Sequence, residues 1–406
     1  MIGFELPESA LQAKAMFSQV AQQLFRPISR KYDVAEHEYP KELNVLKGMM
    51  GGGGAGRGGL PTGDEAPAKD KDAKKDRPET LGANMMSVIS GEEICYGDVG
   101  LMLSVPGQGL GNAAISAVAT PEQKKKFAGK WAAMAITEPA AGSDSGSITT
   151  TAELDGDEWV LNGEKIFVTA ADRCEIVVVW ANIDPAAGKA GIKSFIVEKG
   201  TPGFKLEKLE HKLGIRASDT GTFVLKNCRI PKENLLGTSE VKTETTEGFK
   251  GVMKTFDNTR PMIAAMSNGV SRAALEFTRE QMEKSGCTLD YSKNVNNVSS
   301  VEKEYYLMEA NLEAMRLLTY KAAWMADNKE SNSVEASMSK AKAGRYGTLI
   351  TQKCCEILGP LGLTQKHLPE KWMRDSKILD IFEGTGQIQH LIIARNILKL
   401  SSKELK

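Results

Sequence analysis

Residues 149–181 read TTTAELDGDEWVLNGEKIFVTAADRCEIVVVWA, a stretch in which apolar and polar residues alternate. A period of two predicts β-strands. We expect strands at 149–154, 158–162, 165–169, 176–181, 193–197 and 222–226. Asp155-Gly156-Asp157 and Asn162-Gly163 are turn sequences that should separate neighbouring strands. Residues from about 131 to 240 are therefore predicted to form a compact all-β unit.

Helical periodicity lies on both sides of this unit. Apolar residues recur at steps of three and four from residue 9 to 31 and again from Val301 to Ala326. Pro27 is expected to kink the first helix or end it early. The helix–β–helix order predicts an α+β fold with three domains. We place an N-terminal helical domain at 1–130, a middle β domain at 131–245 and a C-terminal helical domain at 246–406.

A glycine cluster and a run of mixed charge form an insertion at 48–84 within the first domain. The cluster matches the pattern G-x-G-x-x-G through Gly51, Gly53 and Gly56, but no strand precedes it and no helix follows it, as a phosphate-binding loop requires. Such a composition offsets little of its ordering entropy by burial. We expect a flexible surface loop, with a substrate lid as the alternative.

Composition excludes several classes of partner. The 406 residues carry 52 Lys and Arg against 52 Asp and Glu, so the formal net charge of zero argues against nucleic acid or an anionic membrane as the main partner. Six cysteines show no metal-ligand spacing with the four histidines, so we predict reduced thiols and no metal site. Neither a signal or transit peptide nor a membrane span is apparent, which predicts a cytoplasmic protein.

The segment 381–389, IFEGTGQIQ, is the strongest candidate for catalysis. Glu383 follows two large apolar residues, which should desolvate its carboxylate and raise its pKa. Gly384 allows another molecule to approach the backbone closely. A carboxylate in this setting could act as a base; the alternative is a helix-start glutamate that faces the positive end of the helix dipole.

Three segments together resemble the acyl-CoA dehydrogenase family. They are MAITEPAAGSD at 134–144, FDNTRP at 256–261 and the Glu383 segment, in family order and spacing. The resemblance covers roughly residues 8–46 and 85–400. It implies an N-terminal helical domain, a middle β-barrel-like domain and a C-terminal four-helix bundle. It also implies that FAD is the cofactor, that Glu383 removes the α proton of an acyl-CoA thioester, and that hydride passes to flavin N5 to give a trans-2-enoyl-CoA.

The resemblance also assigns binding residues, each of which has a simpler structural interpretation as part of a turn, a strand, an ion pair or a helix start. FAD is assigned to Ile136, Thr137, Gly142, Ser143, Phe167, Thr169, Thr385 and Gln387. The acyl-CoA substrate is assigned to Ser143, Asp257, Arg260 and Gly384. Some relatives carry the catalytic glutamate at the position of Thr259, so the threonine leaves Glu383 without a rival.

The resemblance further implies a dimer of dimers and an electron-transfer flavoprotein as electron acceptor. Relatives place an arginine near residue 285 and a Gln-x-x-Gly-Gly segment near 356–360 to support the neighbouring subunit's FAD. This chain has Ser285, Glu356 and Pro360 instead, so we expect weaker FAD retention. A homotetramer or homodimer is expected, with a heteromer as the alternative. An acyl-CoA oxidase and a subunit that contributes part of a heteromeric site remain the competing functions.

Overall fold

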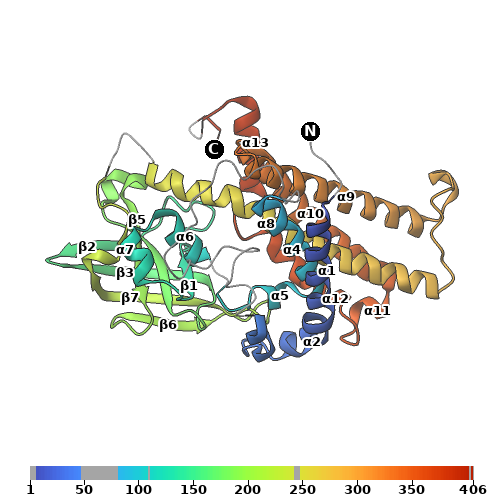
Figure 1. The fold of residues 1–406 in the computed structure, drawn as a ribbon, viewed down its shortest axis with the longest axis horizontal. Coiled ribbons are helices and arrows are strands. Elements are labelled where there is room, and N and C mark those ends of the chain that lie inside the picture. Colours follow the sequence, from blue (N-terminus) through green and yellow to red (C-terminus); the bar gives the residue numbers. More distant parts are fainter. Residues whose placement is uncertain (1–5, 47–80, 108–109, 242–246, 402–403, 406) are drawn as a thin grey trace.

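The computed structural model describes residues 6–46, 81–107, 110–241, 247–401 and 404–405, with the backbone alone for 247–258. Its elements follow the expected order of helices, a β-sheet and helices again (Figure 1). Most of the predicted insertion, residues 47–80, lies outside the described residues. The element type changes between α7 (Pro121–Lys126) and β1 (Ala132–Ala135) and again before α8 (Glu247–Lys284), and the domain boundaries at 130 and 245 stay predictions.

Short helices make up the N-terminal part. They are α1 (Glu8–Val20), the π-helix η1 (Ala21–Phe25), α2 (Arg26–Val34), the 3-10 helix η2 (Lys41–Leu46), α4 (Ala83–Gly97), α5 (Val99–Met102), α6 (Leu110–Val118) and α7. Pro27 was expected to kink the first helix or to end it early, and it does not end it. It lies in the first turn of α2, directly after the wider π-helical turn. At this position the missing N–H of proline has little effect on the hydrogen bonding of the helix.

Among the residues that the structure describes, eight strands form one sheet. They are β1, β2 (Thr151–Asp155), β3 (Glu158–Thr169), β4 (Ile176–Asn182), β5 (Ile192–Glu198), β6 (Phe204–Leu209), β7 (Thr220–Pro231) and β8 (Leu235–Leu236). Seven follow the order β6-β7-β3-β2-β4-β5-β8, and β1 pairs with β4 in parallel. The 3-10 helices η3 (Pro185–Gly191) and η4 (Lys232–Asn234) lie in its connections. Sequence periodicity missed β1, β6 and β8.

The prediction of a hairpin turn at Asn162-Gly163 was wrong. β3 runs through both residues, and its pairing with β7 shifts between Leu161 and Gly163 and again between Lys165 and Val168. A Cβ on Gly163 would lie 2.3 Å from Thr150 Oγ1. The glycine therefore marks a bulge where the strand passes close to its neighbour rather than a chain reversal.

The described C-terminal part contains three long helices, α8, α9 (Ser300–Asp327) and α10 (Ser333–Leu358), and the shorter α13 (Gly386–Leu398). Between them lie the 3-10 helix η5 (Val295–Asn297), α11 (Pro360–Leu363), α12 (Pro369–Ser376) and the 3-10 helix η6 (Lys377–Asp380). α8 packs against β5 and against α10, and Figure 1 shows it running from the sheet into the bundle. By itself the segment 257–261 predicts the start of a helix with Pro261 in its first turn, but Pro261 lies inside α8. The φ of proline is compatible with a helix. Pro261 has no backbone N–H to donate, but the hydrogen bonds of the other turns of this long helix outweigh that one missing bond.

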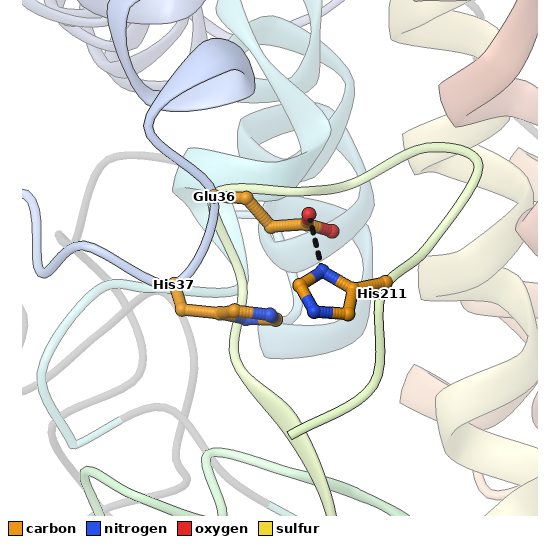
Figure 2. Close-up of side chains that lie close together, drawn as sticks. All are labelled: Glu36, His37 and His211. Carbon is orange, nitrogen blue, oxygen red and sulfur yellow. Dashed lines mark hydrogen bonds and ion pairs between the residues drawn. The ribbon is translucent and has the colours of Figure 1, made fainter. Parts of the chain in front are cut away.

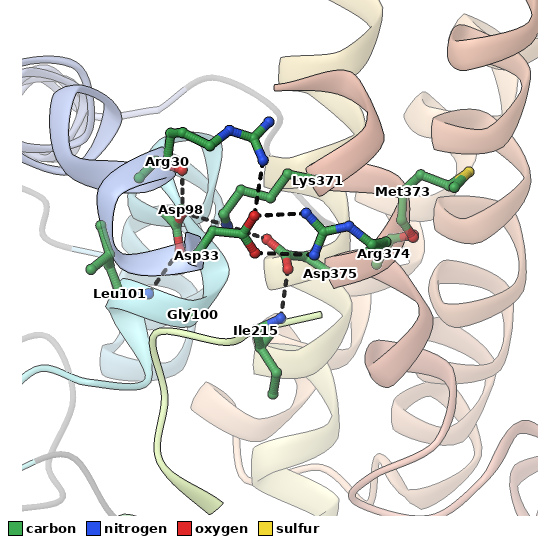
Figure 3. A network of polar contacts seen from close by, with 12 residues as sticks. Arg30, Asp33, Asp98, Gly100, Leu101, Ile215, Lys371, Met373, Arg374 and Asp375 are labelled. Carbon is green, nitrogen blue, oxygen red and sulfur yellow. Dashed lines mark hydrogen bonds and ion pairs between the residues drawn. The ribbon is translucent and has the colours of Figure 1, made fainter. Parts of the chain in front are cut away.

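A buried network of charges fixes the N-terminal helices to α12 (Figure 3). Lys371 Nζ lies 2.6 Å from Asp98 Oδ2 and also bonds Asp375, and all three side chains are buried. Asp375 accepts a hydrogen bond from the Ile215 backbone N at 2.6 Å, and the Arg374 guanidinium lies 2.7 Å from Asp33. α12 leads through η6 directly to Glu383, so this network anchors the start of the candidate catalytic segment.

All six cysteines are free thiols, as predicted, and five of them are buried. Within the described ranges, no helix combines the length and the apolar character needed to cross a membrane.

Candidate active site

Glu383 has an unusual backbone conformation. Its φ is 58°, in the left-handed region that non-glycine residues seldom adopt, and Gly384 follows with a φ of 90°. A Cβ on Gly384 would lie 2.4 Å from the end of the Gln389 side chain at Nε2, and the positive φ would strain any residue other than glycine there. α13 begins at Gly386 with Thr385 as its N-cap, which places Glu383 ahead of the first turn of the helix. This tight loop turns the glutamate away from the path of the helix.

The Glu383 carboxylate lies in a partly desolvated, positively charged environment. Thr259 Oγ1 donates a hydrogen bond to Glu383 Oε2 at 2.9 Å, and Glu383 is half-buried. Burial raises the pKa of Glu383 above its usual range, while the Thr259 hydrogen bond and the charges of Arg260 and Lys340 oppose that rise. The carboxylate is thus more basic than a surface glutamate and only partly exposed, as a proton acceptor requires.

Two further side chains form hydrogen bonds with the loop that contains Glu383. Lys340, fully buried on α10, donates from Nζ to the Gly384 carbonyl at 2.6 Å. Burial lowers the pKa of Lys340 to about 8, although the charges of Asp380 and Glu383 favour its protonated form. Gln389 Nε2 lies 3.1 Å from the same carbonyl. Sequence reasoning missed both residues; a lysine among the small residues of SMSKAKAG was the only signal for the first.

The loop at 136–144 forms a second group around a buried carboxylate. Glu138 accepts hydrogen bonds from the hydroxyls of Thr149 at 2.7 Å and Thr150 at 2.6 Å, and Lys165 Nζ lies 2.7 Å away. Lys165 also donates to the Ile136 carbonyl at 3.1 Å. Burial alone would raise the pKa of Glu138, but these donors lower it to about 2. The ion pair fixes the loop that carries Ile136 and Thr137.

Phe167 and Thr169 extend from the adjacent strand. The Ile166 backbone N donates to the Thr137 carbonyl at 2.9 Å, which joins β3 to the loop. Phe167 lies in the second bulge of β3 with a φ of 57°, and 60% of it is exposed. Thr169 is exposed as well. A bulky residue in a left-handed backbone conformation stores strain of the kind that occurs at binding sites.

The remaining predicted residues differ in exposure. Gly142, Ser143 and Gln387 are exposed, while Ile136, Thr137, Gly384 and Thr385 are half-buried. Arg260 is buried on α8, where its charge acts on Glu383. Asp257 lies on the same helix, in the part described by its backbone alone. The structure thus joins Glu383 to α8 through Thr259, and joins the 136–144 loop to β3, the strand that carries Phe167 and Thr169.

The positions that differ from the family pattern are paired locally. Glu356 lies 2.7 Å from Lys353. Ser285 Oγ donates to the Gln281 carbonyl at 2.9 Å. The negative charge of Glu356 is therefore partly compensated by its own helix.

Comparison with known proteins agrees with this architecture. Residues 133–228 match the model of the acyl-CoA dehydrogenase middle domain, and residues 246–398 match that of the acyl-CoA dehydrogenase C-terminal domain. A mitochondrial short-chain specific acyl-CoA dehydrogenase of Bos taurus is 37% identical over 326 residues, 77% of this chain and 75% of that protein. Subunit CarC of the caffeyl-CoA reductase-Etf complex of Acetobacterium woodii is 34% identical over 334 residues, 79% of this chain and 86% of that protein.

Among solved structures, butyryl-CoA dehydrogenase from Megasphaera elsdenii aligns with a TM-score of 0.79 at 27% identity. The alignment covers 98% of this chain and 100% of that one. These matches confirm the resemblance drawn from the three sequence motifs. The chain belongs to the acyl-CoA dehydrogenase family.

Proposed function

We propose that this protein catalyses the FAD-dependent α,β-dehydrogenation of an acyl-CoA thioester, with Glu383 as the base. One observation carries the assignment of the base. Glu383 is a half-buried carboxylate whose pKa is raised by burial, and a threonine and a glycine-containing loop fix its position. Membership of the family supplies the reaction class.

In the proposed reaction Glu383 takes the α proton of the thioester as a carboxylate and leaves the step as a carboxylic acid. The α C–H and β C–H bonds break, and a Cα=Cβ double bond forms. A thioester α C–H bond is a weak acid, so the developing negative charge on the carbonyl oxygen needs a hydrogen-bond donor. We propose the backbone N–H of Glu383 as this donor, and Lys340 holds the loop that follows it through the Gly384 carbonyl.

The residues around the 136–144 loop suit the cofactor. FAD, when bound, supplies the acceptor for the β hydrogen as hydride. We propose that Ile136, Thr137, Gly142, Ser143, Phe167 and Thr169 hold its ring and phosphates, and that Thr385 and Gln387 bind it from the α13 side. The exposed Phe167 is the observation that supports this fit, since its strained backbone presents an apolar face that a planar ring would cover.

We propose Ser143, Asp257, Arg260 and Gly384 for binding of acyl-CoA. The name of the Bos taurus relative points to short acyl chains as the first substrates to test. The name of the CarC relative supports an electron-transfer flavoprotein as the acceptor of the electrons. A homotetramer or homodimer in the cytoplasm, working in β-oxidation, completes the proposal.

Anaerobic flavin reduction tests the proposal directly. Protein purified with FAD would be mixed without oxygen with butyryl-CoA and longer acyl-CoAs, and the loss of flavin absorbance would be followed. Glu383→Gln is nearly isosteric, so it should retain FAD yet slow reduction by about 10²–10⁴-fold. Glu304→Gln, a change of an exposed carboxylate on α9, serves as the matched control. A Glu383→Gln protein that keeps more than about a tenth of the wild-type rate would exclude Glu383 as the only base.

A further inference from the structure

Two loops from distant parts of the sequence meet beside the sheet (Figure 2). Glu36 and His37 follow α2, and His211 follows β6. One donor atom from each of the three side chains lies within 4.8 Å of the other two. His211 Nδ1 lies 2.9 Å from Glu36 Oε2, and the two imidazole centroids are 5.3 Å apart. None of these residues belongs to the proposed catalytic or cofactor site.

Within the described part of the chain, the ring nitrogens of His37 lack hydrogen bonds. Both of its ring nitrogens are inaccessible to solvent, and neither has a hydrogen-bond partner among the described residues. Buried polar atoms are nearly always bonded, so an imidazole with two unbonded nitrogens suggests a missing ligand. The φ of His37 is 70°, a strained conformation of the kind found at binding sites.

Neighbouring residues hold His37 in this conformation. The Arg216 carbonyl accepts a hydrogen bond from the His37 N at 3.3 Å. Arg173 donates to the His37 and Glu38 carbonyls at 3.3 and 3.1 Å. These contacts hold the backbone of His37, from which the ring extends, before any ligand arrives.

We propose that His37, His211 and Glu36 bind one divalent transition-metal ion of the Zn²⁺ class. Neutral imidazole and carboxylate are donors that Zn²⁺ prefers, and bonds of about 2.0–2.2 Å place neighbouring donors about 3.3 Å apart. The present spacing therefore needs only small side-chain movements. On binding, the metal takes the place of the hydrogen bond between His211 Nδ1 and Glu36, and the neutral imidazole carries its proton on Nε2.

The surroundings predict moderate affinity. Arg216 lies 3.1 Å from Glu36 Oε2, and its charge opposes a cation at the site. The Lys212 backbone N donates to Glu36 Oε1 at 2.9 Å, whereas the Lys212 ammonium points to the Ser218 carbonyl at 2.6 Å. The exposed His211 leaves room for water to complete the coordination. A bound ion would link the end of α2 to the loop that follows β6 and stabilise the folded protein by mass action.

Zinc binding can be measured on the full-length holoprotein after treatment with a chelator. A Cys287→Ser background removes the thiol that is not fully buried. Equilibrium dialysis against Zn²⁺ alone, with elemental analysis, should give one ion per chain, and saturating Zn²⁺ should raise the melting temperature. His211→Asn and His37→Asn should each weaken binding by about tenfold or more. His390→Asn, an exposed histidine on α13, should leave binding unchanged.

The choice of variants keeps the test decisive. Asparagine tolerates the left-handed backbone of residue 37, and the His211 side chain is 85% exposed, so its replacement should not disturb folding. Melting curves without zinc check that both variants are folded. If His37→Asn does not fold, His211→Asn alone decides. Zinc binding that is absent from the parent protein, or that survives His211→Asn unchanged, would overturn the proposal.

Discussion

Replacement of Thr259 by valine should shift the pH dependence of catalysis without removing the base. The Thr259 hydroxyl donates to Glu383 at 2.9 Å and so favours the ionised carboxylate. A hydrogen bond to a charged group is worth about 1.5–3 kcal/mol. One pKa unit corresponds to about 1.4 kcal/mol, so Thr259→Val should raise the pKa of Glu383 by about 1–2 units.

The sign of the effect follows from the role of Glu383. Only the ionised carboxylate accepts the α proton, so the rate falls as the pH drops below the pKa of Glu383. Thr259→Val should therefore move this acidic limb to higher pH by the same 1–2 units. Lys340, with a pKa of about 8, is protonated below that pH and there keeps its attraction for Glu383.

Stopped-flow measurement of anaerobic flavin reduction at saturating acyl-CoA, from pH 5 to 9 in steps, would locate the limb. Thr259→Ser retains the hydroxyl and serves as the matched control, with its limb near that of the wild type. A limb that stays in place in Thr259→Val would refute the reasoning. So would a serine variant that shifts as far as valine, since the hydroxyl would then not be the cause.

Three other changes test separate parts of the site. Glu138→Gln leaves the Lys165 ammonium buried without its carboxylate, so it should lower the free energy of unfolding in urea by about 3–5 kcal/mol. The double variant Glu138→Gln with Lys165→Met removes the unpaired charge and should recover much of that loss. Phe167→Gly relieves a left-handed backbone and should stabilise the FAD-free protein by about 1 kcal/mol while weakening FAD binding; a lower melting temperature without FAD would contradict this. Protein purified alone should lose FAD readily, and Ser285→Arg should raise the flavin content per chain after gel filtration; a full complement in both proteins would show that other residues support the cofactor.

The sequence by itself determined the order of helices, sheet and helices. Burial in each element follows a period of 2 or 3.6 residues, and this period is visible locally. The turn at Asp155-Gly156-Asp157 was predicted correctly because such turns depend on a few adjacent residues. The predictions at Asn162-Gly163 and Pro261 were wrong because the structure there depends on residues far away in the sequence. The pairing of β3 with β7 and the length of α8 outweighed a local turn or helix-start preference.

The chemistry of the site depended on tertiary structure. The sequence drew attention to Glu383, but its hydrogen bond comes from Thr259, 124 residues earlier, and its loop is held by Lys340 from another helix. The pairing of His211 with Glu36 is equally non-local. The pKa of a carboxylate and the donors around a metal ion depend on distances of a few ångströms, and only the folded chain sets these distances between residues far apart in sequence.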